Sequence, residues 1–238
     1  MRLDKLLGDA GLGTRKELKK LIKSGRVTVD GAAAVRPETQ VDPETSCVVV
    51  DGEQVAYSSF HYYMMDKPTG VVTATEDKKQ KTVLDLLPER LRRMGLFPVG
   101  RLDKDTSGLL LLTDDGDFAH RVISPKFYVE KMYYAKVEGE LEQKDADAFA
   151  QGLILRDGTR CLPAGLEILS RDECLVTVRE GKYHQVRRML ASRGKPVKEL
   201  RRLTVGALEL DDGLGAGGFR ELNKDDLCRV FKKENAEK

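Results

Sequence analysis

The sequence has no tryptophan, only four cysteines and no long apolar run. The cysteines, at positions 47, 161, 174 and 228, form no C-x-x-C pair, which argues against a zinc site or a disulfide framework. We expect reduced thiols that are mostly buried. The longest aliphatic run, residues 109–112, is far shorter than the ~20 residues of a membrane helix. Asp4 and Asp9 interrupt the first apolar stretch, so no signal peptide is expected. We therefore expect a cytoplasmic protein without a metal site and without membrane association.

Length and charge pattern suggest two domains and a polyanionic partner. At ~150 residues per domain, 238 residues predict one large and one small domain. Apolar residues make up 40% of the chain, which is enough for a packed core. The net charge of +2 hides two basic clusters, residues 1–26 and 179–202, and an acidic segment at 27–57. Each cluster alone fits a solvated face, but two of them favour a polyanion, whose counterions Lys and Arg release on binding.

The first fifty residues predict two short helices and a strand. Apolar residues at helical spacing, from Leu3 to Ala10, predict the first helix, which Gly11 ends. The segment 14–17, TRKE, is a capping box for a second helix that ends at Gly25. Residues 27–29 alternate as a strand, and a turn at 30–31 follows it. Basic residues of the second helix fall off its apolar stripe and form an outer face that suits RNA.

This segment resembles the S4 RNA-binding domain through the text RLDKLL-x4-LGTRKELKKLIKSGRVTVDG. The resemblance implies an RNA-binding surface made of basic side chains. We expect it to consist of Arg2, Lys5, Arg15, Lys16, Lys19, Lys20 and Lys23. The alternative is a helix pair that only caps the next domain.

From residue 61 onward, strand-like and helix-like segments alternate without a regular βαβ period, which predicts an α+β fold. We expect strands at 61–65, 71–73, 109–113, 133–137 and 175–178. We expect helices at 117–123 and 184–193, and a helix start at 82–85. The domains expected are 1–56 and 60–231, with a disordered tail at 232–238.

The most informative segment is a polar loop at residues 100–108, GRLDKDTSG, which leads into the apolar run. Polar loop residues held by a buried strand are a usual place for chemistry. An ordinary acidic turn is one alternative. A calcium loop is another, because acidic and polar residues from Asp103 to Asp114 have EF-hand spacing. Pro98 and Gly100 exclude the helix that would enter such a loop, so we reject the calcium site.

The text GRLDKDTSGLLLLTDDG, with KPTG at 67–70 and EGKYHQVRRM at 180–189, is similar to the pseudouridine synthases. It is most similar to the ribosomal small-subunit type, which also carries an N-terminal S4 domain. The fold implied is a small, α-L-like S4 domain followed by a mixed-sheet catalytic domain. One departure is Asp66, where the family often has Asn before Lys-Pro, which puts the local turn hydrogen bonds in doubt.

The resemblance implies isomerisation of a uridine to pseudouridine in folded 16S rRNA. The bond from the sugar to N1 breaks, the base rotates and C5 joins the sugar. This reaction requires neither a cofactor nor a metal, and the sequence carries no nucleotide-binding motif. The expected partner is 16S rRNA within a 30S assembly intermediate, and the protein is expected to be a monomer. Two alternatives are a synthase of the same family that acts on 23S rRNA and a non-catalytic rRNA-binding assembly factor.

The resemblance also implies roles for single residues. Asp103 matches the catalytic aspartate of G-R-L-D. The sequence leaves open whether this aspartate attacks the sugar, attacks the base or removes a proton from the sugar. Arg101 and Tyr133 are expected in the substrate pocket, and alternation along the strand favours Tyr133 over Tyr134. Arg187 matches the arginine expected to pair with Asp103, although a surface arginine on a phosphate is an alternative.

Three further basic residues lie near these motifs. Arg188 is expected to contact RNA. His120 and His184 receive no catalytic role, because a lone histidine is more often structural or RNA-facing.

Overall fold

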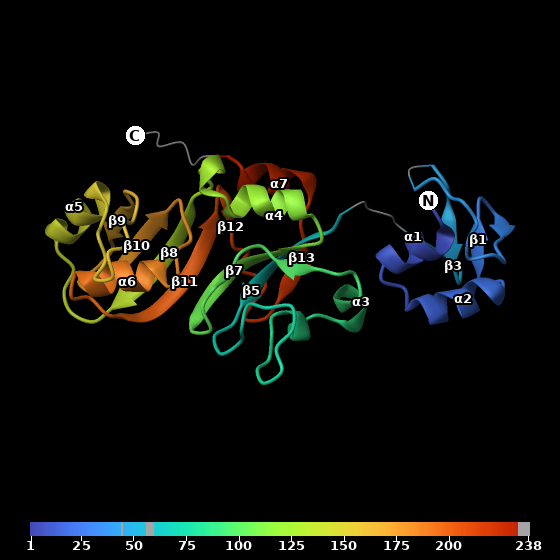
Figure 1. The fold of residues 1–238 in the computed structure, drawn as a ribbon, viewed down its shortest axis with the longest axis horizontal. Helices are drawn as coiled ribbons and strands as arrows, with labels where there is room; N and C mark the ends of the chain where they lie inside the picture. Colours follow the sequence, from blue (N-terminus) through green and yellow to red (C-terminus); the bar gives the residue numbers. More distant parts are fainter. Residues whose placement is uncertain (44, 56–59, 233–238) are drawn as a thin grey trace. The chain divides into compact units, whose positions relative to one another are not determined.

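The computed structural model describes residues 1–43, 45–55 and 60–232, and the chain forms two compact units (Figure 1). One unit comprises Met1–His61 and Leu84–Phe97, and the other comprises Tyr62–Val83 and Pro98–Lys238. The segment 56–59, where the two expected domains meet, and nearly all of the expected tail at 232–238 lie outside the described residues. Within the described ranges, no helix is long and apolar enough to cross a membrane.

Within residues 1–43 and 45–55, the N-terminal unit forms two helices and a four-stranded antiparallel sheet of order β2-β1-β3-β4. Its elements are α1 (Leu3–Asp9), α2 (Arg15–Lys23), β1 (Val27–Val29), β2 (Ala32–Ala33), β3 (Val48–Val50) and β4 (Glu53–Gln54). The core is made by the apolar stripes of both helices and by sheet residues. It contains Leu3, Leu6, Leu7, Leu18, Ile22, Val27, Ala34, Val41 and Val48. The two helices and the strand predicted here are therefore confirmed.

Local signals set the ends of these elements. The backbone N–H of Thr14 donates to Glu17 Oε2 over 2.7 Å and the N–H of Glu17 donates to Thr14 Oγ1, which is the predicted capping box. Asp30 and Gly31 have φ values of 52° and 81°, so both central residues of the turn between β1 and β2 are left-handed.

A later segment belongs to the same unit. It contains the 3-10 helix η1 (Leu84–Leu86) and the one-turn helix α3 (Glu89–Arg92), where the sequence predicted a helix start at 82–85. Arg90 Nε donates to the carbonyl oxygen of Ala10 over 3.2 Å. Gly11 has φ +71°, and a Cβ there would lie 2.6 Å from the carbonyl oxygen of Arg90. Glycine is therefore required at this close approach.

The second unit is built on a nine-stranded mixed sheet of order β13-β5-β7-β11-β8-β10-β9, with β6 and β12 paired beside it. The strands are β5 (Tyr62–Lys67), β6 (Phe97–Pro98), β7 (Thr106–Thr113), β8 (Lys131–Val137), β9 (Gly165–Ile168), β10 (Glu173–Val178), β11 (Val197–Val205), β12 (Leu208–Glu209) and β13 (Phe219–Glu221). β7 and β11 form a parallel pair, whereas the other neighbours in the sheet order and the pair β11–β12 are antiparallel. The predicted α+β class with a mixed sheet is confirmed.

Helices cover this sheet in two groups (Figure 1). They are α4 (Gly116–Ile123), η2 (Pro125–Phe127), α5 (Gln143–Gln151), α6 (Gln185–Ser192) and α7 (Lys224–Val230). Side chains of α5 and α6, such as Phe149 and Met189, share a buried cluster with β8 and β10. The parallel pair β7–β11 runs along the middle of the sheet order. Residues 109–112 of β7 are at most 1% exposed, as expected for a strand covered on both faces.

Three expectations need correction. Residues 71–73 form no strand: a single bridge joins Val72 to Thr82, and the side chain of Thr73 bonds the backbone of Leu102. The helix expected at 184–193 covers only Gln185–Ser192, and His184 before it has a left-handed φ of 48°. The thiols are not mostly buried, since Cys47 and Cys228 are exposed.

Candidate active site

The polar loop at residues 100–105 is fixed by contacts on both sides of Asp103. On one side, Thr73 Oγ1 donates to the carbonyl oxygen of Leu102 over 2.7 Å and accepts from its N–H over 3.2 Å. On the other side, the N–H of Gly70 donates to the carbonyl oxygen of Lys104 over 2.8 Å. The loop then enters β7, the strand parallel to β11 at the middle of the sheet. The backbone of Asp103 is therefore held in a defined position.

Lys67, at the end of β5, supports the same loop. It is fully buried, and its ammonium group donates to the carbonyl oxygens of Asp103 over 3.1 Å and of Thr106 over 2.9 Å, as well as to that of Pro68. Burial lowers the pKa of Lys67 to about 8, against the opposing effect of the nearby carboxylates of Asp103 and Asp105. The sequence motif at 67–70 contains Lys67 but does not indicate this role. A lysine at the end of an apolar strand is the signal that points to it.

Asp66, the departure from the family pattern, has a partner that balances its charge. Arg201 on β11 donates to both of its carboxylate oxygens, over 3.0 and 2.9 Å. Asp66 is only 4% exposed, so the bidentate pair compensates for the burial of its charge. The backbone of Asp66 also bonds Gly217 and Gly218. Aspartate therefore fits here through a distant arginine and not through the local turn.

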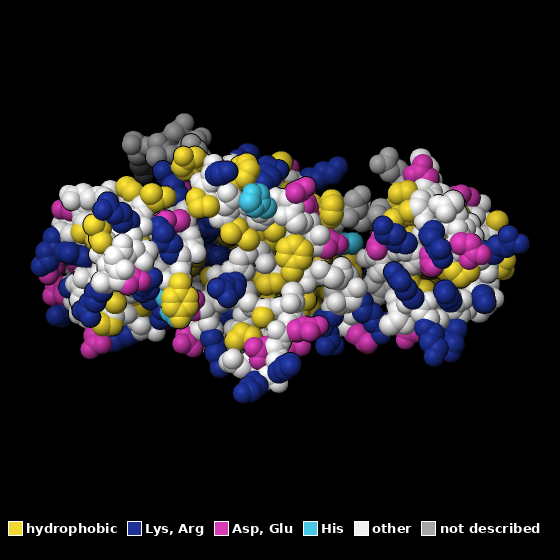
Figure 2. Space-filling model, in the orientation of Figure 1, with side chains coloured by type: hydrophobic (Ala, Val, Ile, Leu, Met, Phe, Trp, Pro, Cys, Tyr) yellow, Lys and Arg dark blue, Asp and Glu magenta, His cyan; other side chains and the backbone are white. Residues whose placement is uncertain are grey.

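A cleft of about 430 Å³ opens beside the loop, and a smaller pocket of about 70 Å³ adjoins it. Both are lined by Arg101, Asp103, Tyr133 and His184. Figure 2 shows that the surface of this unit is hollowed, with basic side chains (dark blue) inside the hollow. Tyr134, by contrast, faces away and bonds Glu173 on β10, which raises the pKa of its hydroxyl together with burial. The structure thus brings three of the expected site residues into one cleft.

Helix α6 and the residue before it bring a guanidinium group and an imidazole ring close to Asp103. Arg187 Nε lies 3.9 Å from Asp103 Oδ2, and His184 Nε2 lies 3.5 Å from Asp103 Oδ1. Arg187 makes its hydrogen bonds to backbone oxygens, with Nη2 donating to that of Asp105 over 3.0 Å. The side chain of Asp103 keeps 31% exposure, so its charge is partly hydrated. His184 directly precedes α6, and its position next to the segment that contains Arg187 is the signal that could have indicated it.

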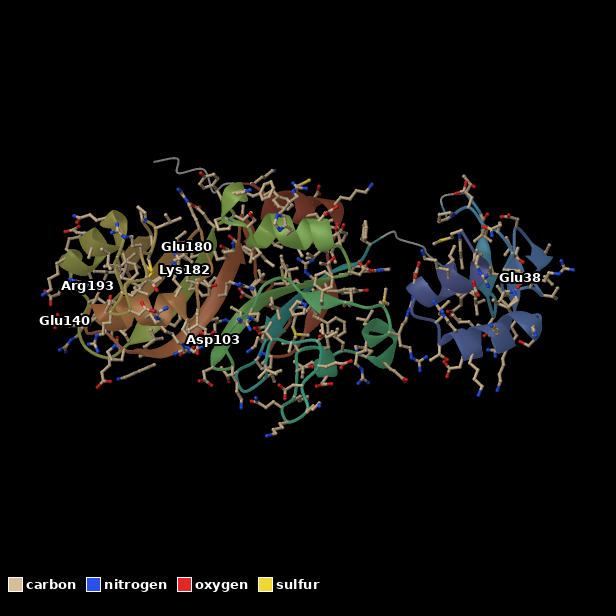
Figure 3. The ribbon with its side chains drawn as sticks, viewed as in Figure 1. Glu38, Asp103, Glu140, Glu180, Lys182 and Arg193 are labelled. Carbon is tan, nitrogen blue, oxygen red and sulfur yellow. The ribbon has the colours of Figure 1, made fainter. Side chains whose placement is uncertain are left out.

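The segment that leads into α6 is anchored by Glu180. Glu180 is 6% exposed, and its Oε1 accepts from the N–H of Leu162 over 2.9 Å and from Gln185 Nε2 over 2.8 Å. Lys182 Nζ pairs with the other oxygen, and Figure 3 shows the two side chains next to each other. This pairing neutralises the second carboxylate of the cleft wall. In the lining of the cleft, Asp103 is then the carboxylate that accepts no hydrogen bond from a described side chain.

Thr106, at the start of β7, lines the smaller pocket. Its hydroxyl oxygen is buried and has no hydrogen-bond partner among the described residues. Buried polar groups are nearly always bonded, so this hydroxyl is available to a polar group of a bound ligand. The sequence pattern alone indicates only a turn residue at this position.

The N-terminal unit carries the basic surface expected from the sequence. All seven of its expected RNA-binding side chains are exposed. Arg2, Lys5, Arg15 and Lys19 line a groove of about 470 Å³. Lys16, Lys20 and Lys23 lie outside the groove lining, and Figure 2 shows basic side chains gathered on this unit.

Arg188 and the rejected calcium loop belong to the second unit. Arg188 Nη2 lies 2.5 Å from Asp157 Oδ2, away from the cleft lining. No group of three or more metal-ligating side chains occurs among the residues that the structure describes. Ser107 and Gly108 lie within β7, so the EF-hand geometry is not formed.

Comparison with known proteins identifies the class to which this fold and site belong. Residues 61–192 match the model of the RNA pseudouridylate synthase family, and residues 1–46 match that of the S4 domain. The chain belongs to the RNA pseudouridylate synthase family, which confirms the isomerase class predicted from the sequence.

Relatives that match this chain over nearly its whole length indicate the type of pseudouridine synthase. An uncharacterized RNA pseudouridine synthase of Bacillus subtilis is 45% identical, with 95% of this chain and 97% of the relative covered. A protein of Vibrio cholerae named ribosomal small subunit pseudouridine synthase A is 44% identical, with 98% and 100% covered. A solved pseudouridylate synthase structure aligns with a TM-score of 0.69 at 33% identity, over 97% of this chain and 99% of that one.

Proposed function

We propose that this protein isomerises one uridine of 16S rRNA to pseudouridine, with Asp103 as its catalytic residue and without a cofactor. The observation that carries this proposal is the position of Asp103. Its carboxylate lies at the junction of the cleft and the smaller pocket, on a loop fixed by Lys67 and Thr73. Full-length relatives named as small-subunit synthases support the choice of substrate.

The chemistry follows from the groups around Asp103. When the bond between C1′ of the ribose and N1 of uracil breaks, its electron pair stays on the base, and the carboxylate acts on the sugar as nucleophile or base. The base rotates inside the pocket, its C5 bonds C1′, and the proton lost from C5 is balanced by one gained at N1. No atom is gained or lost overall. Tyr133 packs against the base, and Thr106 Oγ1 provides a hydrogen bond to it.

Arg187 and Arg101 complete the proposed site. Arg187 supplies positive charge to Asp103 and ties the loop to α6 through Asp105. A neighbouring cation keeps a carboxylate ionised when RNA displaces water from the cleft. Arg101 is exposed at the cleft and meets the RNA around the extruded nucleotide. Arg188 and the basic surface of the N-terminal unit bind the surrounding 16S rRNA, in the form found in a 30S assembly intermediate.

Mapping of pseudouridines in both rRNAs, from cells with and without the gene, tests the proposed function. We expect one 16S position to lose its pseudouridine in the deletion strain and to regain it with the wild-type gene but not with Asp103→Asn. Loss at a 23S position instead would identify a large-subunit enzyme. An unchanged map together with retained rRNA binding would identify a non-catalytic binding factor.

The groove of the N-terminal unit predicts unequal effects of charge reversal along one helix. Arg15→Glu/Lys19→Glu changes the groove lining, whereas Lys20→Glu/Lys23→Glu makes the same charge change on α2 outside it. Removing the interaction with one phosphate should lower the slope of log affinity against log salt by roughly 0.7–0.9. We expect the groove variant to show the larger drop in affinity and the flatter salt dependence in fluorescence anisotropy titrations. Equal effects in both variants would show that only the overall field matters.

A further inference from the structure

Two buried cations of the cleft lining have no carboxylate partner within the part of the chain that the structure describes. Lys131 is 8% exposed and Arg202 is 5% exposed, and both line the cleft. Among the described residues, neither side chain forms an ion pair. The mechanism proposed above uses neither of them. Buried charges in proteins are normally paired with an opposite charge, so these two buried cations need an explanation.

The sheet places both cations next to Tyr133. Arg202 on β11 is the direct cross-strand neighbour of Tyr133 on β8, so the two side chains lie on one face within reach of each other. Lys131 is two residues before Tyr133 on the same strand and therefore shares that face. On the other side of Arg202, β7 has Gly108, where a Cβ would lie 2.2 Å from the carbonyl oxygen of Arg202. Glycine allows the close approach of the two strands.

The protein satisfies these cations only in part. Arg202 Nε donates to the carbonyl oxygen of Leu109 over 2.7 Å, and no hydrogen bond from its two terminal nitrogens to a described residue is found. Lys131 Nζ donates to the carbonyl oxygens of Val122 over 2.9 Å and Val129 over 2.8 Å. Guanidinium has five N–H donors and ammonium has three, so donors remain for a ligand in the cleft. Burial and the charge of Arg202 together lower the pKa of Lys131 to about 8, which shows that the charges are not compensated.

The rest of the cleft has the same sign of charge. Its lining contains five basic side chains, from Arg101 to Arg202, and two acidic ones, Asp103 and Glu180. Glu180 is already paired with Lys182. An apolar-walled cleft with an excess of one charge concentrates ligands of the opposite charge.

We propose that Arg202 and Lys131 form a binding site for a phosphate group of the RNA, beside the pocket that holds the reacting base. The inference rests on the proposed function only in taking RNA as the ligand. Neither cation lines the smaller pocket, where Asp103 and Thr106 meet. The phosphate site is therefore separate from the pocket proposed for the base. A planar guanidinium fork next to an ammonium point charge matches the oxygens of a phosphodiester. Tyr133 lies between the pocket for the base and the phosphate site, so a single bound RNA strand occupies both.

A scan of neutral linkages tests the site. Single methylphosphonates replace the phosphates around the target, one at a time, in the shortest 16S fragment that the wild type modifies, or binds if it modifies none. We expect one linkage to weaken binding to the wild type by roughly 10- to 100-fold, the value of a charge-assisted pair. For Arg202→Gln the same linkage should weaken binding clearly less than for the wild type, because only Lys131 is left to interact with the phosphate. Other linkages should affect both proteins equally.

Two further variants control the comparison. Arg179→Gln removes a guanidinium that is 53% exposed and paired with Glu130 outside the cleft, and it should respond to the scan as the wild type does. Arg202→Lys keeps the charge but loses the fork, and its response should be intermediate. Thermal unfolding shows whether each variant is folded. If Arg202→Gln does not fold, the wild-type scan and Arg202→Lys still decide the outcome.

Each outcome separates the site from the enzymatic function. A wild type with no linkage of special sensitivity, or an Arg202→Gln variant as sensitive as the wild type, overturns the phosphate site. A lower turnover of Arg202→Gln without any change in the scan also overturns it, and indicates contact with the base instead. If the wild type makes no pseudouridine but the linkage effect is present, the proposed function fails and the phosphate site stands.

Discussion

Asp103→Asn is expected to lower the rate of pseudouridine formation by roughly 10³-fold or more, the loss typical of removing a group that acts directly on the substrate. Asparagine keeps the size of the side chain and removes its charge. His184 Nε2 and Arg187 Nε lie 3.5 and 3.9 Å from the carboxylate oxygens of Asp103, whose side chain is 31% exposed, so no strong ion pair is broken. Stability should therefore change by less than about 1 kcal/mol. RNA affinity should also be preserved.

Asp105→Asn is the matched control for this experiment. It makes the same chemical change two residues away, at a side chain that lines neither cavity. The contact of Asp105 with Arg187 runs through its backbone oxygen, which the substitution keeps. Single-turnover rates with saturating enzyme, alongside thermal unfolding and anisotropy titration, measure the three quantities. Equal losses in the two variants would attribute the effect to the shape of the loop and not to the carboxylate of Asp103.

Local features of the fold could be predicted from the sequence because they depend on neighbouring residues. The capping box at Thr14 and the turn at Asp30 act within four residues, and both form as expected. The apolar run at 109–112 lies in a buried strand, as expected for a short continuous apolar run between turn residues. The position of Tyr133 in the cleft follows from the two-residue period of strands.

The remaining features depend on residues far apart in the chain. Arg201 and Asp66 are separated by 135 residues, so no local pattern indicates their pairing. Residues 71–73 have the composition of a strand, but Val72 forms a single bridge, to Thr82. A strand also needs a partner segment, and local propensity does not indicate whether one is present. Arg187 is expected beside Asp103, and it lies there, although its hydrogen bonds go to backbone oxygens. The roles of Asp103, Arg101, Tyr133 and Arg187 stay predictions.

Lys67→Met is expected to slow pseudouridine formation by about 100-fold at neutral pH, although Lys67 has no place in the cleft lining. Methionine has a similar length, but it gives no donor to the carbonyl oxygens of Asp103 and Thr106. A shift of the catalytic group by about 1 Å is enough for a 10²-fold loss. RNA affinity should stay within about twofold, because the basic surfaces are unchanged. Lys136→Met, which removes an exposed strand lysine paired with Glu173, should leave the rate unchanged.

The pH dependence of stability shows whether Lys67 acts through its buried charge. The pKa of Lys67 is lowered from 10.5 to about 8 in the folded protein, so between these values the unfolded chain binds the additional proton. The free energy of unfolding therefore contains a contribution that rises with pH over this window. Lys67→Met should remove that contribution and leave the similar one from Lys131, whose pKa is also lowered to about 8. Urea unfolding at several pH values measures it, and an unchanged profile with a normal rate would show that the loop is held without the ammonium group.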